Sequence, residues 1–314
     1  MKNIVVGIDI GGTNTVIGVV DNTGEIIVET SFETQPFKND KAFSQHLISE
    51  IRYLLNDLAN VNLLGIGIGA PNANYFSGKI ESAPNIPWAK DVSLAAILNK
   101  EFNVVVKLTN DANAAALGEM LYGNAKGLTD FILITLGTGL GSGFVSNGKL
   151  ILGHDGFAGE MGHITAVPGG RLCGCGKQGC LETYVSATGI RTTVLEMMRF
   201  LKTDSVLQKY TPKQITSKLI YEAAVDGDKL AKDVFDFTAK ILGEKLADVV
   251  ALTSPQAVFF FGGLSAAGDL LLVPTKNYME QNLMPIYRNK VSLQQSALIG
   301  KNAAVLGAAA LIWN

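Results

Sequence analysis

The segments GTNTVIGVVDNTGEII (residues 12–27) and GTGLGSGFVSNGKLI (residues 137–151) follow the same order of features. A glycine-threonine pair opens each copy, Gly18 aligns with Gly143, and an apolar strand-like run precedes each. Each copy predicts a strand, a glycine-rich turn, a second strand, a tight turn and a third strand. Asn147-Gly148 is a strong hairpin signal because both central positions of such a turn favour positive φ. The shared order indicates an internal duplication within an α/β fold.

The glycine-rich turns predict phosphate binding, because a turn that follows a strand leaves backbone N–H groups uncovered. Two such turns could hold a polyphosphate from both sides. The P-loop pattern G-x-x-x-x-G-K-[ST] does not occur in the sequence. GIGIGA at residues 65–70 fits the loose dinucleotide pattern, but Pro71 and a turn-rich run follow where that motif needs a helix. We therefore reject a dinucleotide site there.

Two further features belong with these turns. Asp9 ends the first apolar run immediately before the first turn, and a carboxylate beside a phosphate cradle commonly manages Mg²⁺, often through water. A structural turn or cap residue is the alternative for Asp9. The glycine cluster FFFGGLSAAGD (residues 259–269) follows an apolar strand and could receive a nucleoside, although a plain strand-to-helix turn would use the same residues.

Asn110 and Asp111 lie where a buried strand is expected to enter a helix. An Asp at such a junction is most often an N-cap. The small residues that follow, AAA at 114–116, would let a ligand approach closely. A carboxylate in this position could accept the proton of a hydroxyl that attacks a phosphoryl group.

All three cysteines lie in one short loop, Cys173, Cys175 and Cys180, about ten residues after His163. One His and three Cys make the four ligands of a structural zinc site, and the glycines between them allow the backbone to curl tightly. A cluster of redox-labile surface thiols is the alternative, which we consider the weaker because a flexible loop gains nothing from three adjacent thiols. Zinc would then hold a substrate loop and take no part in the chemistry.

Glu160 and Glu182 flank this loop and would be brought toward a common point by the metal. Together with Asn110, Asp111 and His163 they offer carboxylates and an amide that suit adjacent hydroxyl groups. An anionic substrate would instead favour Arg or Lys, and no Arg cluster lies near these motifs. A neutral sugar is therefore the expected substrate.

Composition excludes several classes of function. The 314 residues carry a formal net charge of −2 without a long basic run, so nucleic-acid binding is not expected. No apolar window approaches the ~18 residues that a membrane helix needs, and the N-terminus lacks the pattern of a secretory leader. We expect a cytoplasmic protein without a membrane partner.

Several motifs together resemble the ROK family of sugar kinases and repressors, and most of all its bacterial glucokinases. They are DIGGTNT, NDANAAALGE, LGTGLGSGF, GFAGEMGH, CGCGKQGCLETYVSATGI and FGGLSAAGD, and they run through nearly the whole chain. The resemblance implies an actin-like ATPase (ribonuclease H-like) duplicated fold with two α/β domains flanking a central cleft. It also implies a homodimer. Family repressors carry an N-terminal helix-turn-helix, which is not expected here because the first phosphate motif begins by Asp9.

The resemblance also implies a role for each motif residue. Asp111 would be the base that activates the sugar 6-hydroxyl, with Mg²⁺ and ATP as cofactor and phosphoryl donor. The sugar would be held by Asn85, Asn110, Asp111, Glu160, His163 and Glu182. The nucleotide would be bound by Asp9, Gly11, Gly12, Thr13, Asn14, Thr138, Gly139, Gly262 and Gly263, with Asn14 standing where many members carry Lys. Structural Zn²⁺ would be bound by His163, Cys173, Cys175 and Cys180.

The expected organisation is a small domain of residues 1–113 plus a returning helix at 301–314, and a large domain of residues 114–300. A polar connection is expected at 202–218, and a helix with a buried stripe at 228–253. The predicted reaction is phosphorylation of glucose to glucose 6-phosphate. The alternatives are a kinase for N-acetylglucosamine, N-acetylmannosamine, mannose or fructose, or a sugar-sensing protein without turnover.

Overall fold

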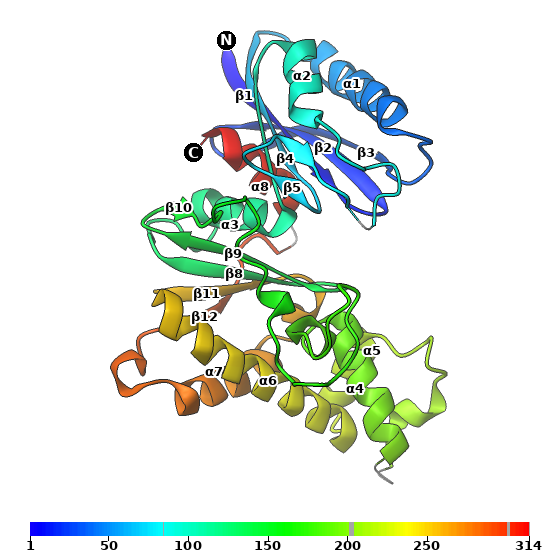
Figure 1. The fold of residues 1–314 in the computed structure, drawn as a ribbon, viewed down its shortest axis with the longest axis vertical. Coiled ribbons are helices and arrows are strands. Elements are labelled where there is room, and N and C mark those ends of the chain that lie inside the picture. The colour runs from blue at the N-terminus through cyan, green and yellow to red at the C-terminus, as the bar shows by residue number, and fades with distance from the viewer. Residues whose placement is uncertain (84, 201–203, 300–301, 314) are drawn as a thin grey trace. The chain divides into compact units, whose positions relative to one another are not determined.

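The computed structural model describes residues 1–83, 85–200, 204–299 and 302–313. The chain forms two compact units (Figure 1). The first comprises Met1–Leu128, Gly143–Gly159 and Ala297–Asn314, and the second Thr129–Ser142 and Glu160–Ser296. The first two residues of the predicted connection, 202 and 203, and residues 301 and 314 of the predicted returning helix lie outside the described residues.

The chain forms two five-stranded sheets that have the same strand order, and residues 143–150 of the second sheet are counted with the first unit. The first is β3-β2-β1-β4-β7, and the second is β10-β9-β8-β11-β12. In both sheets a hairpin is followed by two further strands that run in parallel. In the first sheet β1 pairs in parallel with β4, and β4 with β7. In the second sheet β8 pairs in parallel with β11, and β11 with β12. This correspondence confirms the duplicated α/β fold.

The strands of the first sheet are β1 (Lys2–Ile10), β2 (Asn14–Asp21), β3 (Ile26–Glu33), β4 (Val61–Gly69) and β7 (Val105–Thr109). A small hairpin is formed by β5 (Ala73–Asn74) and β6 (Lys79–Ile80). The helices of this unit are α1 (Asp40–Asn56), α2 (Leu94–Phe102), α3 (Asp111–Tyr122) and α8 (Ala303–Trp313).

The strands of the second sheet are β8 (Phe131–Leu136), β9 (Leu140–Ser146), β10 (Lys149–Leu150), β11 (Ala257–Phe261) and β12 (Ser292–Gln295). Its α-helices are α4 (Ala187–Phe200), α5 (Ser217–Val225), α6 (Lys229–Thr253) and α7 (Asp269–Asn282). Short 3₁₀ turns occur at Met161–His163, Leu181–Thr183, Val206–Lys209, Gly263–Ala267 and Pro285–Tyr287.

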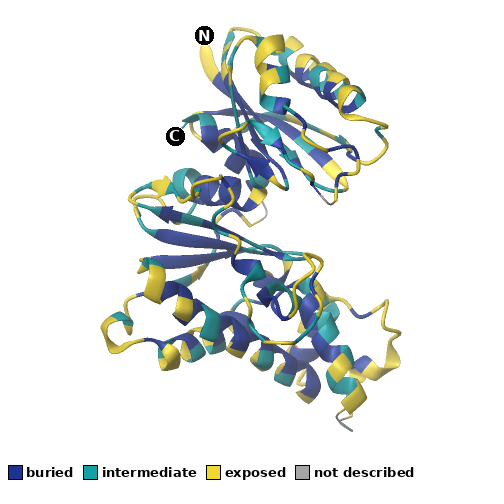
Figure 2. Cartoon of the chain, in the orientation of Figure 1, coloured by how far each residue is buried: buried dark blue, intermediate teal, exposed yellow. Residues whose placement is uncertain are grey.

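The alternation of residues along β1 and β4 decides which helix covers which face of the first sheet. Ile66 and Ile68 point to one side, where they join a buried core that includes Phe43 and Leu47 of α1 (Figure 2). On the other side α8 lies directly on the backbone, and a Cβ at Gly67 would come within 1.8 Å of the Ala308 carbonyl oxygen. The glycines of GIGIGA therefore allow close helix packing, which agrees with our rejection of a dinucleotide site.

The first unit differs from the predicted small domain in its extent. It continues to Leu128, includes residues 143–159 and takes in 297–314, whereas the sequence suggested a boundary at 113. The physical reason is the contact between α3 and α8, which meet through glycines: a Cβ at Gly307 would lie 2.4 Å from the Ala114 carbonyl oxygen. Helix α3 therefore belongs to the first core.

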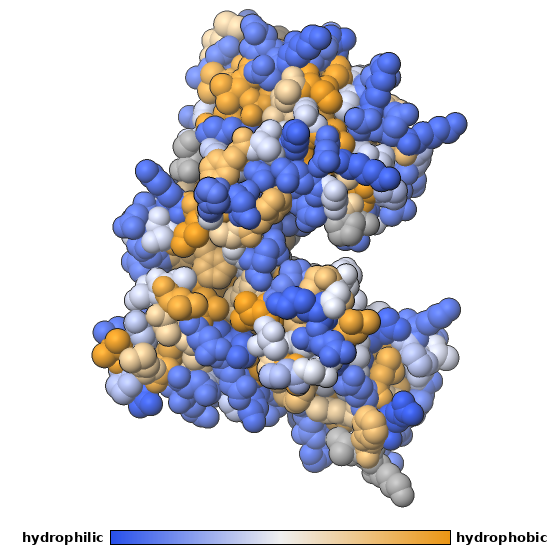
Figure 3. Space-filling model, viewed as in Figure 1, coloured by the Kyte–Doolittle hydropathy of each residue, from blue (hydrophilic) through white to orange (hydrophobic). Residues whose placement is uncertain are grey.

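The expected hairpin and helix are present in the second half of the chain. Asn147 and Gly148 have φ values of 51° and 72°, as the predicted turn requires. Helix α6 buries Leu230, Val234, Ile241 and Leu242 of the predicted stripe, with Phe237 half-buried. Figure 3 shows apolar residues exposed in patches among hydrophilic side chains, and no described helix is long and apolar enough to cross a membrane.

Candidate active site

Asp9 and Asp111 lie at the carboxyl ends of the parallel strands β1 and β7 in the first unit, on either side of β4. Asp9 is in register with Gly69 of β4, and Gly69 is in register with Thr109 of β7. Asp111 follows Thr109 by two residues, and its Cα is 3.7 Å from the place that a Cβ at Gly69 would occupy. The lack of a side chain at Gly69 thus leaves room between the two carboxylates.

The start of α3 shows that Asp111 is not the N-cap of this helix. The N-cap is Asn110, whose side chain accepts a hydrogen bond of 2.8 Å from the Asn113 N–H. Asp111 is the first helical residue, and its Oδ1 accepts a bond of 2.8 Å from the Ala112 N–H. The second carboxylate oxygen is not needed for this local bond, so Asp111 can act on a ligand while Asn110 serves the helix.

The pKa values of both carboxyl groups are raised. Burial, and after it the charge of Asp111, raises the pKa of Asp9 to about 7. Desolvation also raises the pKa of Asp111, against the opposing effect of the Ala112 N–H. A pair of acids that resists full ionisation near neutral pH is suited to binding a cation and to accepting a proton.

The first glycine-rich turn connects Asp9 to β2. The Gly11 N–H donates to the Asn14 carbonyl over 2.9 Å, and Asn14 is exposed at the start of the strand. Asn85, predicted to shape the sugar pocket, packs on this turn: a Cβ at Gly12 would lie 3.1 Å from its Cβ. The structure therefore places Asn85 beside the predicted phosphate turn within the same unit.

The second glycine-rich turn, residues 137–139, lies beside the third glycine cluster in the second unit. Strand β11 is in register with β8, which pairs Phe261 with Thr135. Gly262 follows with φ of 99°, and a Cβ there would come within 2.7 Å of the Leu136 carbonyl oxygen. The predicted phosphate turn and the predicted nucleoside cluster thus start from adjacent strand ends.

A cavity of about 420 Å³ adjoins that cluster. It is lined on one side by Gly263, Leu264 and neighbouring alanines, and on the other by Tyr221 of α5 and Phe235 of α6. Ser217, Lys218 and Glu222 supply polar groups at the lining. Its size and largely apolar walls suit a planar base with few polar contacts.

His163, Cys173, Cys175 and Cys180 come together in the second unit, with their ligand atoms all within 4.8 Å of one another. The Cys173 Sγ is 3.6 Å from the His163 Nδ1, and the Cys175 Sγ is 3.7 Å from the Cys180 Sγ. Ligands about 2.3 Å from a tetrahedral zinc are separated by about 3.8 Å, so the donor set and spacing fit this metal. Burial raises the pKa of Cys173 and Cys180, and a bound cation would offset the cost of ionising them.

The loop around these ligands depends on a glycine. Gly179 has φ of 79°, and a Cβ there would come within 1.7 Å of the Val167 carbonyl oxygen. The Gly179 N–H donates to the Arg171 carbonyl, and the Cys173 N–H donates to that of Lys177. The backbone is therefore curled by its own hydrogen bonds, and the sulfur atoms project inward from it.

Glu160 and Glu182 flank His163. The Glu160 Oε2 is 4.0 Å from the His163 Nε2, and the Glu182 Oε1 is 3.6 Å from the Nδ1. The Glu182 Oε1 also lies 2.9 Å from the Cys173 Sγ. The structure thus gathers three of the predicted sugar-binding residues around the predicted metal cluster, while Asn85, Asn110 and Asp111 belong to the first unit.

Arg171 was missed by the sequence reasoning although it organises the base of this loop. Its guanidinium donates to the carbonyl oxygens of Thr183 (2.6 Å) and Gly189 (3.2 Å), forms an ion pair with Glu196, and lies 4.3 Å from the centre of the Tyr184 ring. A lone basic residue between two glycines and a cysteine, in a chain poor in charge, is the signal that could have found it.

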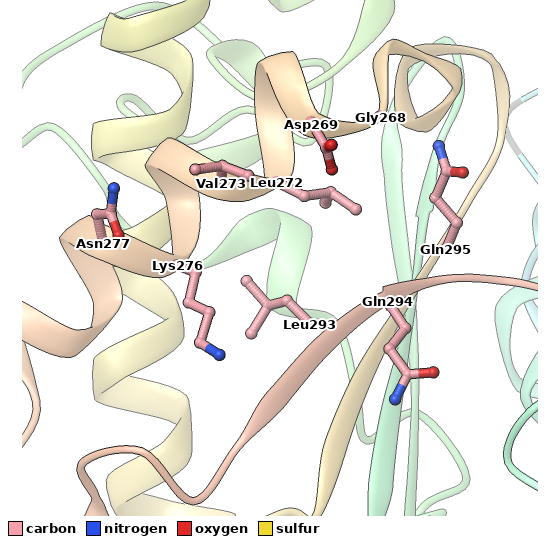
Figure 4. A pocket seen from close by; sticks show the side chains of 9 residues that line it. All are labelled: Gly268, Asp269, Leu272, Val273, Lys276, Asn277, Leu293, Gln294 and Gln295. Atoms are coloured by element: carbon pink, nitrogen blue, oxygen red, sulfur yellow. The ribbon is translucent and has the colours of Figure 1, made fainter.

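A second cavity, about 310 Å³, lies between α7 and the edge strand β12 (Figure 4). Asp269 and Lys276 line it from the helix, and Leu293, Gln294 and Gln295 from the strand. It contains none of the predicted site residues. The glycine-rich turns and the cluster of His163 with three cysteines therefore remain the candidate sites within their units.

Comparison with known proteins identifies the family. The family model described as ROK matches residues 5–314. The chain belongs to the ROK family. It is 36% identical to a glucokinase of Halalkalibacterium halodurans, over 98% of this chain and 94% of that protein.

Solved structures of ROK proteins resemble the chain as well. A ROK glucokinase from Streptomyces griseus, in complex with glucose and AMPPNP, is 34% identical with a TM-score of 0.80, over 98% of both chains. A ROK transcriptional regulator, a homologue of the Escherichia coli MLC protein, is 27% identical with a TM-score of 0.88; it matches all of this chain and 78% of its own. The family therefore contains both kinases and regulators with this fold.

Proposed function

We propose that this protein phosphorylates glucose at its 6-hydroxyl with ATP as the donor. The observation that carries the proposal is the Asp9–Asp111 pair, in which the charge of Asp111 acts on Asp9, at strand ends on either side of β4 and beside a glycine-rich turn. The similarity to glucokinases over nearly the full length of the chain supports this assignment, and the similar structure with glucose and AMPPNP supports the pairing of substrates.

In the proposed reaction Asp111 is the base. The sugar hydroxyl oxygen attacks the γ-phosphorus, its proton passes to the Asp111 carboxylate, and the bond from the γ-phosphorus to the bridging oxygen breaks to release ADP. The charge on the transferred group is spread over its oxygens, so positioning and electrostatics supply most of the catalysis. Asp111 suits this role because Asn110 already caps the helix and because the carboxylate is open to solvent.

Asp9 and the glycine-rich turns form the proposed nucleotide site. Asp9 would hold Mg²⁺, directly or through water, and the metal would neutralise charge on the phosphates. The turns containing Gly11, Gly12 and Thr13 and containing Thr138 and Gly139 would bind phosphate oxygens through their N–H groups, and exposed Asn14 could add an amide. The cavity beside Gly262 and Gly263 would receive the base.

Glu160, His163 and Glu182 would bind sugar hydroxyls, together with Asn85 and Asn110. Zinc bound by His163, Cys173, Cys175 and Cys180 would fix these groups and supply no chemistry of its own. The two ring nitrogens of His163 support these two roles. The Nδ1 atom lies near the Cys173 sulfur and could bind zinc, while the Nε2 atom lies near Glu160 and could contact the sugar. We also propose a cytoplasmic location and a homodimer.

Two other functions compete with this one. Kinases for N-acetylglucosamine, N-acetylmannosamine, mannose or fructose would use the same Asp111. A sugar-sensing protein without turnover is favoured by one observation, the similarity to a ROK transcriptional regulator. The carboxylate pair favours a kinase, since a sensor has no use for a base.

The test is ADP release from MgATP by the purified protein with glucose, mannose, fructose, N-acetylglucosamine and N-acetylmannosamine. We expect the highest kcat/KM for glucose. A higher kcat/KM for another sugar would replace glucose and keep the reaction. Sugar binding by calorimetry without ADP release from any sugar would support the sensor instead.

A further inference from the structure

The second glycine-rich turn is anchored by residues that directly follow the metal-binding loop. The Thr188 hydroxyl donates to the Thr138 carbonyl oxygen over 2.6 Å, and the Ala187 N–H donates to the Gly137 carbonyl oxygen over 2.9 Å. At the end of the turn, the Leu140 N–H lies 3.4 Å from the Glu182 Oε2. Three separate contacts thus join the turn to residues 182–188.

The same residues are bonded to the zinc-binding loop. The Thr183 N–H and hydroxyl both donate to the carbonyl oxygen of Cys180, over 3.1 Å and 2.7 Å. The Ser186 hydroxyl donates to the Glu182 carbonyl over 2.7 Å and lies 3.0 Å from the Thr188 hydroxyl. Hydrogen bonds and one close hydroxyl contact, joined by the Glu182–Thr183 peptide bond, therefore connect a metal ligand to the turn.

The anchored carbonyls fix the direction of the phosphate-binding donors. In a trans peptide the C=O of one residue and the N–H of the next lie in one plane and point in opposite directions. Holding the Gly137 carbonyl therefore orients the Thr138 N–H, and holding the Thr138 carbonyl orients the Gly139 N–H. These are two of the N–H groups proposed to bind phosphate.

We propose that Thr188 is a positioning residue for the nucleotide phosphates, and that zinc and nucleotide binding are thereby thermodynamically linked. This inference rests on the proposed function, in which residues 137–139 bind phosphate. Zinc would then act on both substrates: on the sugar through His163, and on the nucleotide through the bonds that run from Cys180 to Thr188. By reciprocity, a nucleotide would tighten zinc by the same factor by which zinc tightens the nucleotide.

The first test measures the dissociation constants of MgADP and glucose by calorimetry, without turnover, for three variants. Thr188→Val keeps the shape of the side chain and removes the donor; we expect MgADP to bind about tenfold more weakly, with glucose affinity and zinc content unchanged. Thr188→Ser restores the hydroxyl and should bind MgADP like the wild type. Thr192→Val is the matched control one turn later on α4. Among the described residues, the Thr192 hydroxyl donates only to the Thr188 carbonyl oxygen of its own helix.

Unchanged MgADP affinity in Thr188→Val would overturn the positioning role. So would an equal loss of glucose and MgADP affinity in that variant, because it would indicate a general disturbance of the unit. A failure of Thr188→Ser to restore binding would overturn the role of the hydroxyl itself.

The second test measures zinc affinity by competition with a zinc-selective chromogenic chelator, with and without saturating MgADP. We expect MgADP to tighten zinc about fivefold or more in the wild type and in Thr192→Val, and to have little effect in Thr188→Val. Equal zinc affinity with and without MgADP in the wild type would overturn the linkage. If the wild type binds no MgADP at all, the proposed kinase function fails instead, so the two failures are distinguishable.

Discussion

The charge of the Asp111 carboxylate acts on Asp9. Burial, the larger cause, and the charge of Asp111, the smaller one, raise the pKa of Asp9 to about 7. Asp9 must be ionised to hold Mg²⁺, so nucleotide binding is expected to depend on pH. Between about pH 8 and pH 6 the wild type should lose about tenfold in MgADP affinity, as Asp9 becomes protonated. Calorimetric titrations across this range measure the effect.

Asp9→Asn is the control for that titration. The variant should bind MgADP weakly, and its affinity should change little between the same pH values. An identical pH dependence in the variant would assign the titration to another group, such as the nucleotide itself.

The raised pKa of Asp9 also predicts a change in folding stability. An acid that binds its proton more tightly in the folded state stabilises the fold fully below its unfolded pKa, and this contribution is lost as the pH rises through the folded value. Asp9→Asn is therefore expected to raise the free energy of unfolding by about 4 kcal/mol at about pH 8 and to change it little at about pH 4. Urea denaturation at both pH values measures this; a variant less stable than the wild type at the higher pH would contradict it.

Asp111→Asn is expected to lower kcat by about 10³-fold, since a general base contributes roughly 10²–10⁴. The affinities for glucose and MgADP should stay within a few-fold, because an amide oxygen can still accept the Ala112 N–H. Near wild-type turnover in this variant would show that Asp111 is not the base.

Helix α1 offers a matched control for Asp111. It also begins with an Asn-Asp pair: Asn39 accepts from the Ala42 N–H, and Asp40 accepts from the Lys41 N–H over 2.9 Å, just as Asn110 and Asp111 do in α3. Asp40→Asn therefore repeats the local change away from the candidate site, and its kcat should equal that of the wild type. Comparing the two variants separates a role in catalysis from a role at a helix start.

The metal cluster predicts about one zinc per chain in protein prepared without chelator. Lys177 lies in the loop between Cys175 and Cys180, and its ammonium donates to the His163 carbonyl. We expect zinc removal to release this loop, so that trypsin cleaves after Lys177 at least about tenfold faster. Mass spectrometry identifies the cleavage site; equal cleavage rates with and without zinc would show that the metal does not hold the loop.

Much of the fold could be predicted because its signals are local. The positions of the glycines predicted the duplicated hairpin. The residue types of Asn147 and Gly148, which both adopt positive φ, predicted the turn between its strands. The cluster of His163 with three cysteines was legible because its ligands lie close together in sequence. Each of these features is decided by a few adjacent residues.

The remaining features depend on contacts between distant segments. The extent of the first unit follows from the approach of Gly307 to Ala114, and no local pattern shows that these two helices meet. The bond from Thr188 to Thr138 joins residues 50 positions apart. The role of Asn110 as the cap, which leaves Asp111 available, was also not decided by the sequence, since either residue type can cap a helix.

Arg171 is expected to control the stability of the metal-binding loop, because its bonds tie the start of the loop to the start of α4. It contacts the carbonyl oxygens of Thr183 and Gly189 and pairs with Glu196, in a fork geometry that an ammonium group cannot reproduce. Arg171→Lys should therefore lower the free energy of unfolding by about 2 kcal/mol, and zinc should be lost to a chelator faster. Arg191→Lys is the control, since the Arg191 guanidinium donates to the Pro212 carbonyl oxygen and to no residue of the loop in the part of the chain that the structure describes. If both variants unfold at the same urea concentration as the wild type and retain zinc equally well, the loop is held by its glycines and its metal without help from Arg171.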